Sequence, residues 1–133
     1  MGFQWTDDLL TGVADIDAQH KELFSRINGL IDACRQEEDK EEIGKYLEFL
    51  REYIAFHFAA EERTMTERKY PGLPEQEREH EAFKKRVNEQ YRNYSAGKGA
   101  SIQVVLATIQ SSGEWLVNHI MKTDRAMAAF LKK

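Results

Sequence analysis

The two prolines of this chain, Pro71 and Pro74, lie close together, and no other proline occurs among its 133 residues. Proline interrupts helices and central strands, so this segment is a strong break between structural elements. A second break, residues 95–101, contains two glycines, and the charged residues 36–40 form a weaker third. The three breaks divide the chain beyond about residue 15 into four long segments.

Apolar side chains recur at steps of three and four residues within each of these segments. This spacing is typical of an amphipathic helix, because residues three and four apart share one helix face. No segment is rich in β-branched residues that alternate with polar ones, so no strand is expected. The residues on the predicted apolar faces are Ile16, His20, Leu23, Ile27, Leu30 and Cys34, then Ile43, Leu47, Leu50, Ile54, His57 and Glu61, then Gln76, His80, Phe83 and Val87, and finally Ile102, Val105, Ile109, Leu116, His119 and Met127.

The expected fold is an all-α, antiparallel up-down-up-down four-helix bundle, because short connections make neighbouring helices antiparallel. An N-terminal arm of residues 1–15 precedes the bundle, and residues 1–133 are expected to form one domain. The predicted helices cover approximately residues 16–37, 40–68, 74–95 and 102–131.

Several residues mark where the helices are expected to begin. Asp39, followed three residues later by Glu42, resembles a capping box. Pro74 suits the first turn of a helix, and Ser101 is a candidate N-cap of the last one. The apolar side chains of the arm that are available to pack against the bundle are Phe3, Trp5, Leu9 and Leu10.

Composition excludes several classes of partner. Hydrophobic residues make up 41% and charged residues 32%, with a net charge of −4, which suits a soluble globular protein. No Lys/Arg cluster is left unbalanced by acids, so nucleic acid is not an expected partner. No apolar stretch approaches the ~20 residues that cross a bilayer, and the N-terminus does not resemble a signal peptide. We therefore expect no membrane partner. Because Cys34 is the single cysteine, we also expect a reducing, cytoplasmic location.

The four histidines provide the main functional signal, because each lies on the predicted apolar face of a different segment: His20, His57, His80 and His119. Glu61 follows the second histidine at i+4, and Gln76 precedes the third at i−4, so each pair shares a face. Asp124 follows the fourth by five residues, an offset of ~140° that can still reach the interior of a bundle.

A single histidine on an apolar face is more often a hydrogen-bonded core residue than a metal ligand. Four of them together with two inward carboxylates favour the opposite interpretation. Burial of Glu61 and Asp124 as carboxylates without cations would cost roughly several kcal/mol, or the carboxylates would have to be protonated. No Lys or Arg lies on the same helix face to pair with them. Imidazoles with carboxylates and no thiolate favour iron, and less well manganese or zinc. A pair of metal ions in the core of the bundle is therefore predicted.

The chain also resembles the bacterial hemerythrin family over nearly its whole length. The residues that carry the resemblance are Trp5 and Gly12, residues 17–23 with the sequence DAQHKEL, residues 57–62 with the sequence HFAAEE, Met65, residues 70–72 with the sequence YPG, residues 79–83 with the sequence EHEAF, and residues 115–124 with the sequence WLVNHIMKTD.

The resemblance implies a site and an activity. One iron would take two histidines, His20 and His57, and the other would take histidines of the third and fourth helices. Glu61 and Asp124 would bridge the two ions together with an oxo or hydroxo group. Dioxygen would bind reversibly to the two-histidine iron, and no enzymatic activity is expected beyond a weak peroxidase-like reaction. A dry pocket would protect the bound product; its expected lining, for which a plain core role is an equally good interpretation, is Leu23, Phe58, Trp115, Leu116 and Ile120.

One position departs from the family pattern, since Gln76 stands where the resemblance implies a third histidine for the second iron. The amide oxygen could coordinate, a water could fill the position, or the position could stay vacant. We expect the iron pair to persist with a more labile second ion. An open second iron also suggests an alternative, a redox protein or sensor that reacts with peroxide, nitric oxide or azide. A metal-free interaction bundle is a third interpretation, but it leaves Glu61 and Asp124 unexplained.

Overall fold

The computed structural model describes residues 3–37, 39–95 and 102–132. Its described residues are helical and contain no strand, which confirms the predicted all-α bundle. The elements are a 3₁₀ turn at Asp7–Leu9, then α1 (Ala14–Arg35), α2 (Lys40–Glu67), α3 (Leu73–Ser95) and α4 (Ile102–His119), which continues through a π-helical turn (Ile120–Asp124) into α5 (Arg125–Leu131).

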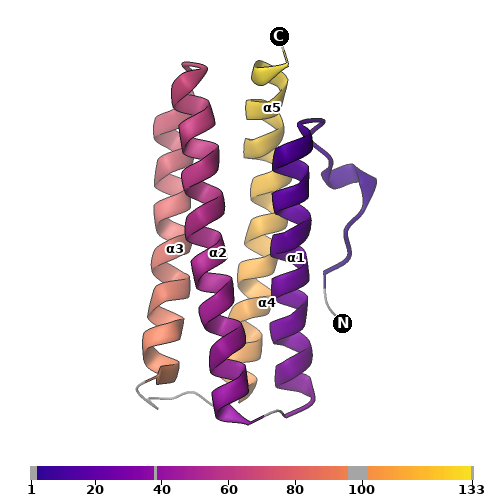
Figure 1. Cartoon of the computed structure of the whole chain (residues 1–133), viewed down its shortest axis with the longest axis vertical. Helices are drawn as coiled ribbons and strands as arrows, with labels where there is room; N and C mark the ends of the chain where they lie inside the picture. The colour runs from indigo at the N-terminus through magenta and orange to yellow at the C-terminus, as the bar shows by residue number, and fades with distance from the viewer. Residues whose placement is uncertain (1–2, 38, 96–101, 133) are drawn as a thin grey trace.

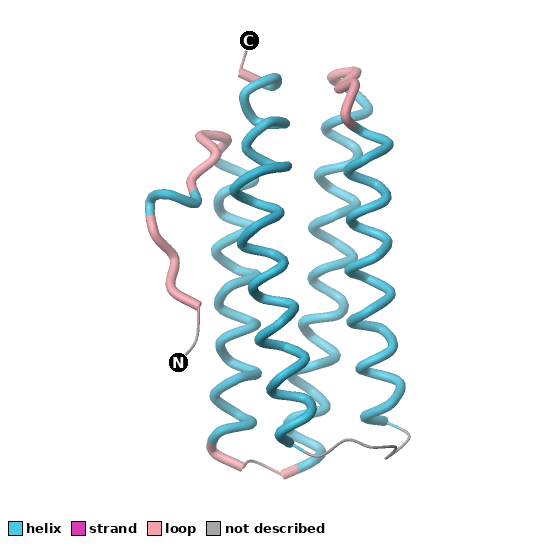
Figure 2. Tube along the Cα trace, turned by 180° about the vertical axis from the view of Figure 1, so that it is seen from behind, coloured by secondary structure: helices cyan, strands magenta, loops and turns pink. Residues whose placement is uncertain are grey.

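Four columns of helix stand side by side, and α4 and α5 together form one of them (Figure 1). Helix α1 packs against α2 and α4, and α3 packs against the same two helices. Each column therefore has two neighbours, and all four surround one interior. The N-terminal arm runs along the outside of α1, as the view from behind also shows (Figure 2).

The helix ends show the expected boundary chemistry at two places. Asp39 is the N-cap of α2, and its side chain accepts a hydrogen bond from the backbone N–H of Glu42 at 2.9 Å. Pro74 lies in the first turn of α3, where its missing N–H leaves no helical bond unmade. Helix α1 ends before residue 37, because Glu37 adopts a positive φ of 53°. Ser101, the predicted cap of the last helix, lies outside the described residues.

The last column differs from the regular helix that was predicted for residues 102–131. Residues Ile120–Asp124 form a π-helical turn, which has i→i+5 hydrogen bonds and is wider than an α-helical turn. In a regular helix the five-residue offset would rotate Asp124 ~140° away from His119. The wider turn reduces that rotation, and the His119 Nε2 and Asp124 Oδ1 atoms lie 3.2 Å apart. The departure from α-helix therefore brings both side chains into the interior.

The arm is fixed by apolar and polar contacts with α1. Trp5 packs edge-on against Phe24, with ring centroids 5.4 Å apart, and Leu9 is buried. The backbone N–H of Phe3 donates to the side chain of Asn28, which donates back to the carbonyl of Phe3. Leu10, by contrast, is 39% exposed, so its expected packing was wrong. Leu10 follows the 3₁₀ turn with extended backbone angles, and its backbone N–H donates to the carbonyl of Asp7.

A glycine on α4 allows the arm to approach the bundle. A Cβ atom at Gly113 would overlap the aromatic ring of Phe3, so a larger residue there would displace the start of the arm. The described helices include none that is long and apolar enough to cross a membrane.

Candidate metal centre

The predicted metal-site residues all lie in the interior of the bundle. The four histidines, Glu61, Gln76 and Asp124 are each at most 3% exposed. They come from every column: His20 from α1, His57 and Glu61 from α2, Gln76 and His80 from α3, and His119 and Asp124 from α4 and the π-helical turn.

One group of site residues consists of His20, His57 and Glu61, and we call it the first position. The Nε2 atoms of both histidines lie 3.2 Å from the same oxygen, Glu61 Oε2. Because His57 and Glu61 are four residues apart on α2, they project from one face of that helix. The ring of His20 reaches this face from α1, with the two imidazole centroids 4.8 Å apart.

The second position is the group of Glu61, His80, His119 and Asp124. The Nε2 atom of His80 lies 3.3 Å from Glu61 Oε1, and the Nε2 atom of His119 lies 3.2 Å from Asp124 Oδ1. These residues come from α2, α3, α4 and the π-helical turn, so the position depends on the packing of several helices.

Each carboxylate serves both positions with a different oxygen atom. Glu61 directs Oε2 to the histidines of the first position and Oε1 to His80 of the second. Asp124 directs Oδ1 to His119, and its Oδ2 lies 3.1 Å from His20 Nε2. Two carboxylates that each present one oxygen to each position have the arrangement needed to bridge two cations.

Three of the imidazoles form hydrogen bonds through Nδ1 with side chains that were not predicted as site residues, Gln19, Glu62 and Glu79. We call these the backing acceptors. The Nδ1–H group of His57 donates to the Gln19 amide oxygen at 2.7 Å. His80 donates in the same way to Glu62 at 2.8 Å, and His119 donates to Glu79 at 2.7 Å.

The backing acceptors follow one rule. Each is the immediate sequence neighbour of a site residue on its own helix, and each bonds a histidine of the next helix along the chain. An oxygen acceptor at Nδ1 selects the tautomer whose Nε2 lone pair is free, and here that atom faces the interior. The only signal in the sequence that could have pointed to the backing acceptors is that each is a polar residue next to a predicted ligand. His20 differs, because its Nδ1 has no hydrogen-bond partner within the described part of the chain.

The buried imidazoles and carboxylates of the centre shift one another's pKa values. Burial lowers the pKa of His20, but hydrogen bonds with Asp124 and Glu61 outweigh it and raise the pKa to about 9. Burial likewise lowers the pKa of His119, and its contacts with Asp124 and Glu79 raise it to about 8. Burial raises the pKa of Glu61, while its histidine neighbours hold it well below the usual range. Without a metal ion, protons on the imidazoles therefore compensate the buried carboxylates.

Those protons do not satisfy the whole centre. Besides Nδ1 of His20, six buried atoms of the centre make no hydrogen bond of acceptable geometry to described residues, although several lie 3.1–3.3 Å from a neighbouring site atom. Buried polar atoms are rarely left without a hydrogen-bond partner. A group of such atoms in one small region therefore calls for an explanation. All are metal-donor atoms, and bound cations would satisfy them. The atoms are Nε2 of His57, His80 and His119, Oε1 of Glu61 and Gln76, and Oδ2 of Asp124.

Aromatic rings stack on both imidazoles of the second position. The ring of Phe58 stacks on His80, with centroids 3.8 Å apart and planes 2° apart. Trp115 stacks on His119 with centroids 4.8 Å apart, and it is only partly buried. Leu23, Leu116 and Ile120 are buried in the main core. Their predicted role as the lining of a dioxygen pocket stays a prediction.

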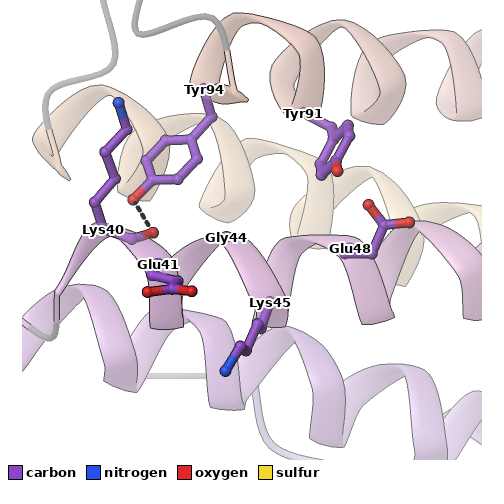
Figure 3. A pocket seen from close by; sticks show the side chains of 7 residues that line it. All are labelled: Lys40, Glu41, Gly44, Lys45, Glu48, Tyr91 and Tyr94. Atoms are coloured by element: carbon purple, nitrogen blue, oxygen red, sulfur yellow. Dashed lines mark hydrogen bonds between the residues drawn. The ribbon is translucent and has the colours of Figure 1, made fainter.

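Two surface hollows differ in their relation to the centre. A cleft of about 320 Å³ between α1 and α2 is lined in part by Gln19 and Glu61. A broader groove of about 600 Å³ lies between the start of α2 and the end of α3, where Tyr94 donates a hydrogen bond to the carbonyl of Lys40 (Figure 3). Its α2 residue nearest to the centre is Glu48, nine positions before His57, or about 13 Å along the helix.

The fold and the site together define a class of protein, a four-helix bundle with two candidate cation positions that share carboxylates between histidines. The family model described as the hemerythrin HHE cation binding domain matches residues 11–131. The chain therefore belongs to the hemerythrin family.

Individual relatives agree with this assignment. The chain is 35% identical to a bacteriohemerythrin of Stenotrophomonas maltophilia over 96% of this chain and 80% of that protein. It is 30% identical to a myohemerythrin of Theromyzon tessulatum over 92% of this chain and 88% of that protein. A crystal structure of wild-type hemerythrin superposes with a TM-score of 0.90 at 30% identity, covering 98% of both chains.

Proposed function

We propose that this protein holds two iron ions and binds dioxygen reversibly, as an oxygen carrier, store or scavenger. The observation that carries the proposal is the sharing of Glu61 and Asp124 between two groups of buried histidines. The names of the relatives, bacteriohemerythrin and myohemerythrin, support it. A donor set of imidazoles and carboxylates with no thiolate fits iron.

The residues divide between the two ions as follows. His20 and His57 would hold one ion, and His80 and His119 would hold the other. Glu61 and Asp124 would each give one oxygen atom to each ion, with the oxo or hydroxo bridge that the family resemblance implies. When bound, the iron pair would supply electrons to dioxygen and recover them when dioxygen leaves.

The chain itself would control protons and water. The backing acceptors keep the Nδ1–H tautomer of three imidazoles, so that their Nε2 atoms stay available as donors. The buried side chains of Leu23, Phe58, Leu116 and Ile120 would limit the access of water to the centre. The first position has two imidazoles and no counterpart of Gln76, and we place dioxygen there.

We also propose that the protein is a binding protein rather than an enzyme and that it works in the cytoplasm. The location is supported by the single cysteine, Cys34, which is buried. A redox protein or sensor that reacts with peroxide, nitric oxide or azide is the alternative that an open second iron would favour.

The test is an optical titration of metal-free protein with ferrous iron under argon, followed by air and then argon again. We expect two irons per chain, a visible absorption band that forms with dioxygen, and loss of that band when dioxygen is removed. Irreversible oxidation on the first exposure to air would favour the redox alternative. Fewer than two irons per chain would contradict the proposal.

A further inference from the structure

The side chain of Gln76 is completely buried, one helical turn before His80 on α3. Its Nε2 atom donates to Asp124 Oδ1 at 3.0 Å and lies 3.5 Å from the backbone carbonyl oxygen of Thr123. The amide is therefore in direct contact with the carboxylate that reaches both positions of the centre.

The chemistry of these two partners fixes the orientation of the amide. An ionised carboxylate and a backbone carbonyl only accept hydrogen bonds, so the NH₂ group of Gln76 must face them. The flipped amide would place its oxygen against two acceptors and is excluded on that ground. The Oε1 atom consequently lies on the opposite side of the amide group from these two partners, where it is buried and has no hydrogen-bond partner among the described residues.

We propose that Gln76 is a protein ligand of the second position through Oε1, with its NH₂ group anchored on Asp124. The inference rests on the proposed metal centre and specifies one of its donors. An amide oxygen is a neutral, hard donor that suits divalent cations, and it leaves the charge of the centre the same as a neutral imidazole would. The second position would then have two nitrogen donors, one amide oxygen and the shared carboxylates.

The anchored NH₂ group gives Gln76 a second effect. A hydrogen bond to Asp124 Oδ1 orients the carboxylate that both positions share. An imidazole in the same place could not donate to Asp124 while its ring nitrogen binds the metal from the same side. Gln76 therefore couples ligand binding at the second position to the orientation of the bridging carboxylate.

Metal retention in matched variants tests the inference. Cobalt(II), loaded under argon into metal-free protein, serves as a spectroscopic probe, and a chelator then measures the release of each ion. Gln76→Leu removes the proposed donor, Gln76→His supplies an imidazole, and Gln90→Leu removes another buried glutamine of α3 as the control.

We expect Gln76→Leu to release its second ion at least ~10-fold faster than the unaltered protein, the lower end of what loss of an outer hydrogen-bond partner already costs. Release of the first ion changes less, and Gln90→Leu behaves like the unaltered protein. Gln76→His retains the second ion and shifts the cobalt absorption bands, because a nitrogen replaces an oxygen donor. Equal retention and equal spectra in all the proteins would overturn the inference.

A crystal structure of the cobalt-loaded protein decides between direct and water-mediated binding. An Oε1–cobalt distance of about 2.2 Å supports the proposal, and a water molecule between them contradicts it. If Gln76→Leu does not fold, the spectrum of Gln76→His and this distance still give the answer. Unaltered protein that takes up fewer than two irons per chain in the ferrous titration would instead refute the proposed function, which keeps the two failures distinct.

Discussion

The two positions of the centre share Glu61 and Asp124 but differ in what lies behind their imidazoles. In the second position, His80 and His119 each donate to a carboxylate, Glu62 or Glu79. In the first position, His57 donates to the neutral amide of Gln19, and His20 has no Nδ1 partner among the described residues. The second position is therefore backed by two negative charges and the first by none.

This difference coincides with the residue that departs from the family pattern. A backing carboxylate makes an imidazole a stronger donor and holds its orientation. The second position, where Gln76 replaces a histidine, has this support at both remaining imidazoles. Phe58 and Trp115 also stack on those two rings and restrict their motion. We infer that the second position compensates for a weaker donor, while the first keeps a more adjustable set of ligands.

Removal of the Glu61 carboxylate, which both positions share, should weaken metal binding the most. Glu61→Ala deletes one donor from each, and loss of even an outer partner costs ~10–100-fold in metal affinity. We therefore expect at least ~100-fold weaker binding at both positions, measured as iron per chain after desalting. Glu67→Ala, at an exposed site on the same helix, is the control. Retention of one tightly bound iron would show that the positions do not depend on Glu61 equally.

Removal of a backing carboxylate should weaken metal binding less, and at only one of the two positions. Glu79→Leu leaves the Nδ1–H group of buried His119 without its acceptor. We expect release of the second ion to a chelator to accelerate by about 10–100-fold, with little change at the first. The matched change Gln19→Leu should affect the first ion instead. If both variants labilise the same ion, the assignment of backing acceptors to separate positions is wrong.

Proton release distinguishes the two positions only weakly, because each contains one imidazole whose pKa is raised. His20, with a pKa of about 9, and His119, with a pKa of about 8, are charged at pH 7 in the metal-free protein. Metal binding requires neutral imidazoles, so loading at pH 7 should release about one proton from each. An indicator in weakly buffered solution measures this release. Loading at pH 7 without proton release would contradict the charge assignment.

The same groups predict how the stability of the metal-free protein depends on pH. His20 and His119 have raised pKa values in the folded state, so their contribution is complete below about 6.5 and is lost as the pH rises through about 8 to 9. Glu61 and Asp124 have lowered pKa values, so their contribution is lost as the pH falls below about 4. Thermal unfolding of metal-free protein across this range should show both losses. Iron-loaded protein should lack the alkaline one.

The smallest effect comes from making the first position resemble the second. Gln19→Glu would place a carboxylate behind His57, as Glu62 and Glu79 stand behind the other two histidines. We expect a few-fold slower release of the first ion, because Gln19 already supplies an acceptor. Stopped-flow competition with a chelator measures the change. Faster release would mean that the neutral acceptor at the first position is required.

The sequence predicted those parts of the molecule that depend on spacing along one helix. Steps of three and four residues identified the bundle, and the i+4 relation placed Glu61 beside His57. The π-helical turn at Ile120–Asp124 was missed, because regular spacing cannot signal one extra residue in a turn. Asp124 was assigned to the interior because a five-residue offset can still reach the interior of a bundle, and the wider turn supplies the remaining rotation.

The backing acceptors could not be assigned for a different reason. Gln19, Glu62 and Glu79 stand at positions where their own helix turns them away from the ligand beside them. Which histidine each one reaches depends on the neighbouring helix, and only the packing of the bundle supplies that information. The orientation of the Gln76 amide is similar, because it depends on Asp124 and Thr123, which lie more than forty residues away in the chain.

Anomalous diffraction at the iron edge from iron-loaded crystals would locate the bound ions themselves. We expect two iron peaks per chain, one in contact with His20 and His57 and the other with His80 and His119, with Glu61 and Asp124 each touching both. A single peak, or two peaks that do not share these carboxylates, would contradict the proposed centre.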